Sequence, residues 1–125
     1  MRAPVVLILG AVGLFPIALS YGVSPAQTLQ FLLGFEVQGT NHTHVFRAIM
    51  GLYLANAAFW LIAARTPELI RLALWVMVLF MGGLAAGRVL SLVVDGVPSP
   101  LLLFYLLAEL GFAILAWRAL QQSAP

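Results

Sequence analysis

Four apolar stretches of about 20 residues each limit what this chain can fold into. A helix needs roughly 20 mainly apolar residues to cross the hydrocarbon core of a bilayer, which is about 30 Å thick. The alternating apolar and polar residues of a membrane β-barrel, in segments of about ten residues, do not occur in this sequence. The sequence therefore predicts an all-α protein, a bundle of four transmembrane helices with spans at residues 4–22, 43–64, 70–94 and 100–120.

The composition agrees with a membrane protein and excludes several other classes. Charged residues make up 8% of the chain and hydrophobic residues 63%, whereas about 25% of the residues of soluble domains are charged. The six basic residues are scattered arginines, so no basic patch indicates a nucleic-acid partner. The absence of cysteine excludes a disulfide scaffold and a cysteine zinc site. We expect one integral membrane domain over residues 1–125, with the lipid bilayer as its surroundings.

A short helix is predicted between the first two spans. The Ser-Pro-Ala-Gln sequence at residues 24–27 is typical of a helix start, with a serine cap, a proline in the first turn and a glutamine that completes a capping box. The helix that follows, to about Phe35, is too short to cross a bilayer. We therefore expect it to lie at the membrane surface as an interfacial helix.

The placement of the charged residues predicts the orientation of the spans. With four spans, one side of the membrane carries Arg2, Arg65, Arg71 and Arg118. By the positive-inside rule, both termini then face the cytoplasm. Arg2 and the Ala-Leu-Ser sequence at residues 18–20 also resemble parts of a signal peptide. Because four spans agree with the side on which the arginines fall, we expect the first helix to be retained.

Each of the last three spans contains one ionisable residue away from its ends, namely Arg47, Arg88 and Glu109. Placing an ionisable side chain in the hydrocarbon core costs free energy, and such residues usually face the interior of the bundle. At a rise of about 1.5 Å per residue, they lie roughly 6, 10 and 14 Å from the non-cytoplasmic side, near enough in height to meet. Helical spacing adds three neighbours. The predicted polar cluster consists of Arg47, Arg88, Glu109, Ser91, Asp95 and Tyr105.

Two roles are open for this cluster. A buried arginine–glutamate pair can fix the register of helices, or the two arginines can bind a polar or anionic head group. One glutamate between two arginines would stay ionised, which argues against Glu109 as a proton carrier. Two arginines against one glutamate would also leave a positive surplus unless Asp95 cancels it.

Two further motifs are weaker candidates. His42 and His44 form a His-x-His pair in the predicted outer loop, but a metal site needs three or four converging ligands. We therefore predict no metal and no cofactor. Gly83 and Gly87 form a small-xxx-small motif, which lets helix backbones approach closely, either inside the bundle or in contact with a partner helix or a second copy of the chain.

Three segments carry a family resemblance. They are Phe-Arg-Ala-Ile-Met-Gly-Leu-Tyr-Leu at residues 46–54, Gly-Arg-Val-Leu-Ser-Leu-Val-Val-Asp-Gly-Val-Pro at residues 87–98, and Ala-Glu-Leu at residues 108–110. In this order and spacing they resemble a bacterial family of small four-helix membrane proteins, catalogued as domain of unknown function 4345. The resemblance covers nearly the whole chain. It implies a four-helix protein of the bacterial inner membrane and implies no activity.

Three classes of function stay open from the sequence. Small size and short loops favour an accessory or structural subunit of a larger membrane complex, and we expect this class first. The second class is a binder of a lipid-like or small anionic ligand at the intramembrane arginines. The third is a small membrane enzyme or proton-coupled transporter that uses Glu109. No serine elbow, phosphate loop or histidine-rich metal array occurs, so the sequence favours a protein without catalytic activity.

Overall fold

Helices account for almost the whole of the described chain. The computed structural model describes residues 2–122, which form α1 (Ala3–Gly22), α2 (Pro25–Leu33), α3 (Gly39–Ala64), α4 (Pro67–Val94) and α5 (Pro100–Gln122). Of these, α1, α3, α4 and α5 are long and apolar enough to cross a membrane. The predicted fold class, four long helices with a short helix after the first, is confirmed.

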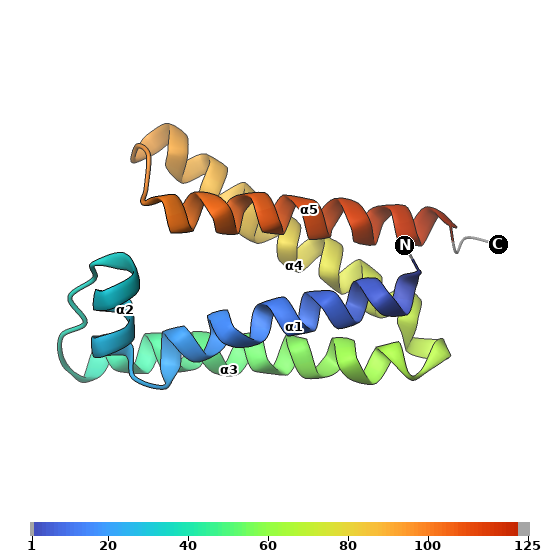
Figure 1. The fold of residues 1–125 in the computed structure, drawn as a ribbon, viewed down its shortest axis with the longest axis horizontal. Coiled ribbons are helices and arrows are strands. Elements are labelled where there is room, and N and C mark those ends of the chain that lie inside the picture. The colour runs from blue at the N-terminus through green and yellow to red at the C-terminus, as the bar shows by residue number, and fades with distance from the viewer. Residues whose placement is uncertain (1, 123–125) are drawn as a thin grey trace.

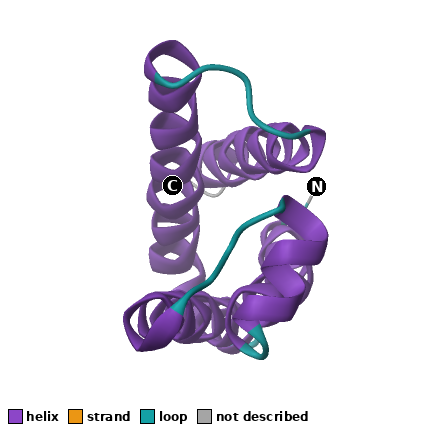
Figure 2. Cartoon of the chain, turned by 90° about the vertical axis from the view of Figure 1, so that its left-hand side faces the viewer, coloured by secondary structure: helices purple, strands orange, loops and turns teal. Residues whose placement is uncertain are grey.

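The four long helices pack as two pairs (Figure 1). α1 lies along α3, and α4 packs mainly on α5. The start of α1, the end of α5 and the α3–α4 connection lie at one end of the bundle, whereas α2 and the α4–α5 loop lie at the other. The view along the bundle shows that α4 is inclined to the other long helices (Figure 2). α4 therefore starts beside α3 and moves away from it toward its own C-terminal end.

The helix boundaries follow the sequence signals in part. Proline occupies the first position of three helices, where its fixed φ suits the helix and its missing N–H costs nothing: Pro25, Pro67 and Pro100. The predicted capping box is wrong in one respect. The Ser24 hydroxyl bonds to the Gln27 side chain at 3.2 Å and caps no backbone N–H. α3 begins at Gly39 and α4 at Pro67, earlier than the predicted residues 43 and 70.

Glycine lets α1 approach its neighbours closely at two points. A Cβ atom added at Gly10 would overlap the end of the Met77 side chain of α4, and one added at Gly22 would overlap Met50 of α3. Met77 and the Trp60 side chain are fully buried in the core formed there. Close contact of this kind replaces the hydrophobic driving force that helices lack inside a membrane.

Candidate functional site

An ion pair joins α4 to α5 inside the bundle. Arg88 Nε donates a hydrogen bond to Glu109 Oε1 at 2.7 Å, and the two side chains are 22% and 10% exposed. Tyr105 lies one helical turn before Glu109 on α5, and the Arg88 guanidinium carbon is 5.6 Å from the centre of its ring. Residues four apart share one helix face, so this face of α5 offers Arg88 both a carboxylate and an aromatic ring.

All three tyrosines of the chain surround this ion pair. Tyr21, Tyr53 and Tyr105 are buried, and all three interact electrostatically with Arg88. The rings of Tyr21 and Tyr53 meet edge to face at 5.7 Å. Tyrosine prefers this setting because its ring is apolar and its hydroxyl needs a polar partner. We call Arg88, Glu109 and the three tyrosines the polar centre. Its residues come from all four long helices.

The structure brings only some members of the predicted cluster together. Arg88, Glu109 and Tyr105 meet as predicted from helical spacing, but the Arg47 side chain is exposed on α3 and forms no ion pair within residues 2–122. The physical reason is the inclination of α4, whose C-terminal part lies away from the start of α3 (Figure 1), while Arg88 pairs with Glu109 of α5. Glu109 thus has one arginine as its partner, and the pair is electrically balanced.

Ser91 and Asp95 lie on α4 beyond Arg88, but they form a contact of their own. The Ser91 hydroxyl donates a hydrogen bond to Asp95 Oδ2 at 2.6 Å, one helical turn away. Asp95 is exposed at the end of α4. It therefore belongs to the surface at the α4–α5 loop.

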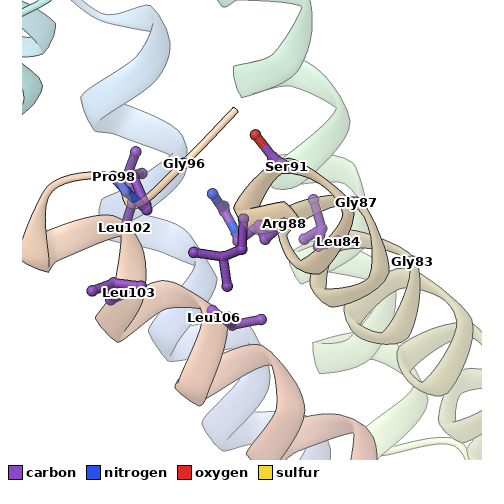
Figure 3. A pocket seen from close by; sticks show the side chains of 11 residues that line it. Gly83, Leu84, Gly87, Arg88, Ser91, Gly96, Pro98, Leu102, Leu103 and Leu106 are labelled. Carbon is purple, nitrogen blue, oxygen red and sulfur yellow. The ribbon is translucent and has the colours of Figure 1, made fainter. Parts of the chain in front are cut away.

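A cavity of about 330 Å³ opens between α4 and α5 beside this ion pair (Figure 3). Arg88 extends from α4 toward α5 there, and Ser91 lies one turn further along α4. Leu102, Leu103 and Leu106 of α5 line the opposite wall. We call this space the α4–α5 crevice. Its polar groups lie on one wall, and the other wall is apolar.

Gly83 and Gly87 of α4 line this crevice. A Cβ atom added at either position would meet no atom within 4 Å. The close helix approaches of the bundle occur instead at Gly10 and Gly22. The small-xxx-small motif of α4 thus leaves room for something other than this chain.

The His-x-His motif lies inside a helix and not in a loop, which corrects the prediction. α3 begins at Gly39, so His42 and His44 belong to its first two turns. His42 Nδ1 accepts a hydrogen bond from the backbone N–H of Gln38 at 3.0 Å and thereby helps to cap α3. Among residues 2–122, no group of three or more histidine, aspartate or glutamate side chains could hold a metal ion.

Comparison with known proteins assigns the chain to a family. Residues 3–120 match the family described as a domain of unknown function (DUF4345). The chain belongs to the DUF4345 family. The match covers nearly the whole chain and confirms the resemblance seen in the sequence. No curated protein and no solved structure matches this chain. The polar centre and the α4–α5 crevice both lie within the DUF4345 match.

Sequence reasoning missed two members of the polar centre of this DUF4345 chain, Tyr21 and Tyr53. Tyr21 lies near the end of its span, where an aromatic residue is usually an interfacial anchor. Its position therefore did not indicate a place in a buried polar cluster. The position of Tyr53 did, because a tyrosine in the middle of a transmembrane span needs a polar partner for its hydroxyl. Applying that rule would have added Tyr53 to the predicted cluster.

Proposed function

We propose that the chain is a non-catalytic protein of the bacterial inner membrane, with both termini in the cytoplasm, that binds a lipid-like molecule in the α4–α5 crevice. The observation that carries the proposal is the pairing of Arg88 and Ser91 on one wall with three leucines on the other. Ligand sites are typically apolar with a few polar groups that fix orientation. Acyl chains suit the leucine wall, and oxygen atoms of a head group suit Arg88 and Ser91.

The charge balance of the polar centre indicates what kind of head group fits. A guanidinium has five N–H donors, so Arg88 can hold Glu109 and a head-group oxygen at the same time. Because Glu109 already balances the charge of Arg88, the head group needs hydrogen-bond acceptors and does not need a full negative charge. A phosphate, ester or hydroxyl head group meets this requirement, whereas a small anion without acyl chains would leave the leucine wall uncovered.

The proposal is tested by native mass spectrometry of protein extracted together with its lipids. We expect a lipid adduct of fixed stoichiometry on the wild-type chain. Gly87→Leu places a large side chain in the crevice and should reduce this adduct at least fivefold. Gly51→Leu is the matched control, because Gly51 is also an open helical glycine with no atom within 4 Å of an added Cβ, but it lies on α3 outside the crevice. Equal adducts on both variants would contradict the proposal.

An accessory role in a larger membrane complex, or self-association, is the second candidate. The observation that favours it is the open surface at Gly83 and Gly87, since small residues at this spacing allow a second helix to pack closely. A partner helix would occupy the same crevice as the lipid. In the same experiment it would be detected as a co-purifying protein at fixed stoichiometry, lost in Gly87→Leu and kept in Gly51→Leu.

A proton-coupled transporter or membrane enzyme based on Glu109 is the reading that the geometry favours least. Such a role requires a carboxylate free to change its protonation state. Arg88 donates a hydrogen bond to the Glu109 carboxylate at 2.7 Å, so this carboxylate is already engaged inside the bundle.

A further inference from the structure

A second cavity, of about 180 Å³, lies between the four long helices and has Arg88 in its wall. We call it the central cavity. All four long helices contribute to its walls, for example through Gly13, Tyr53, Arg88 and Ala108. It shares only Leu84 and Arg88 with the α4–α5 crevice. A ligand in one space would therefore contact a largely different set of residues from a ligand in the other.

Two tyrosine hydroxyls in the walls of the central cavity have unused hydrogen-bonding capacity. Tyr53 and Tyr105 line the cavity and are 7% and 8% exposed. Neither hydroxyl forms a hydrogen bond with any residue of the described chain. Neither hydroxyl oxygen is among the fully buried polar atoms of the described chain that lack a partner, so both hydroxyls are accessible. An oxygen-bearing molecule in the cavity would give each of them a hydrogen-bond partner.

The electrostatics of the cavity favour an uncharged molecule. Arg88 and Glu109 are its only charged lining residues in the described chain, and they form a balanced pair. A charged ligand would place an uncompensated charge in a setting of low dielectric constant, which is costly. A hydroxyl group, in contrast, can accept a hydrogen bond from a tyrosine and donate one to a carboxylate oxygen.

The size and the walls of the cavity favour a single ring. A protein cavity of about 150 Å³ lined by apolar side chains is large enough to hold benzene, and the central cavity has about 180 Å³. Tyr105 and Phe112 of α5 and Met81 of α4 line it. Aromatic side chains and methionine sulfur both pack favourably against a flat ring.

We propose that the central cavity binds an uncharged, single-ring molecule of the phenol class, with its ring against Tyr105, Phe112 and Met81. Its hydroxyl group bonds to Tyr53, Tyr105 and the carboxylate of Glu109. This site is distinct from the α4–α5 crevice, so the proposal does not depend on lipid binding there. Arg88 forms part of both sites and holds the Glu109 carboxylate in place through their ion pair.

The test is a ¹⁹F NMR titration of the purified full chain in detergent micelles with 4-fluorophenol and with fluorobenzene, each corrected for partition into protein-free micelles. We expect saturable binding of 4-fluorophenol to the wild-type chain.

Ala108→Leu fills the central cavity and should weaken this binding at least tenfold. The matched control is Ala58→Leu, because Ala58 is an exposed helical alanine of α3 and its replacement should leave binding unchanged. Absence of saturable binding to the wild-type chain, or equal binding to the two variants, would overturn the proposal.

A second variant tests the recognition of the hydroxyl and preserves the shape of the cavity. Replacing Tyr53 and Tyr105 together by phenylalanine removes two oxygen atoms and keeps both rings. The affinity for 4-fluorophenol should fall at least fivefold, because a single lost hydrogen bond has about this effect and two are removed. The affinity for fluorobenzene should not fall. An unchanged preference for 4-fluorophenol would refute the assignment of the tyrosines. Gly87→Leu should leave 4-fluorophenol binding intact, and loss of binding in this variant would place the ligand in the crevice instead.

Discussion

Removal of the negative charge of Glu109 is expected to destabilise the bundle clearly. In Glu109→Gln, the Arg88 guanidinium loses its counter-charge and keeps the Tyr105 ring and the Tyr21 side chain as partners. Breaking a buried pair from one side typically costs about 3–5 kcal/mol in soluble proteins. Polar interactions between spanning helices are smaller, about 0.6 kcal/mol on average and about 1.7 kcal/mol at most. Thermal unfolding in one detergent measures the loss.

The structure places the expected cost between these limits. The Arg88 side chain is 22% exposed and lies beside the α4–α5 crevice, so water can partly hydrate a guanidinium that has lost its partner. The cation–π contact with Tyr105 contributes up to about 2 kcal/mol in desolvated settings and remains in the variant. We therefore expect Glu109→Gln to cost about 1–2 kcal/mol, near the upper end of the membrane range.

Two variants make this prediction refutable. Glu68→Gln is the matched control, because Glu68 is an exposed acid in the first turn of α4 and should tolerate the change. Replacing the whole pair, Arg88→Met with Glu109→Leu, removes both charges and should cost less than Glu109→Gln alone, since apolar replacement of a complete buried pair is often nearly neutral. If Glu109→Gln unfolds at the same temperature as Glu68→Gln, or if the double variant is the less stable one, the ion-pair reasoning is refuted.

Two more predictions concern topology and packing. Reporter fusions at residues 40 and 67 should report opposite sides of the membrane, because α3 connects these positions as a span; the same side for both would contradict the four-span arrangement. Gly22→Ala should lower the unfolding temperature, because its added Cβ would overlap the Met50 Cβ. Gly51→Ala is the control, because Gly51 is at an open helical position. Its replacement should leave the free energy of unfolding unchanged or raise it by up to about 1 kcal/mol. Equal effects would mean that α1 and α3 are not in close contact at Gly22.

The fold could be predicted from the sequence because membrane solvation constrains it strongly. Every backbone polar group in the hydrocarbon region must be satisfied within the segment, so four long apolar stretches lead directly to four helices. The proline boundaries then placed the starts of α2 and α5 closely. The start of α3 was placed too late, since residues 39–42 are polar and were assigned to a loop. A polar first turn is compatible with a helix when His42 caps it.

The site could be predicted only in part, because spacing along a helix does not determine which helices meet. Tyr105 and Glu109 share a face of α5 whatever the arrangement of the helices. They contact Arg88 because α4 and α5 are adjacent in the bundle. The position of Arg47 depends on the crossing angle of α4, which follows from packing between helices far apart in sequence. The same angle determines that Gly83 and Gly87 line a crevice.

The inclination of α4 also explains how the ion pair and the two cavities belong together. α4 starts beside α3 and moves away from it toward its own C-terminal end (Figure 1). The central cavity and the α4–α5 crevice both border this part of α4, and Arg88 lines both of them. Without the Arg88–Glu109 pair, α4 and α5 would be joined near this level only by apolar contacts, which define helix position weakly in a membrane. A role in fixing the helices and a role in binding are therefore compatible, since the residues that fix the position of α4 also give both spaces their polar groups.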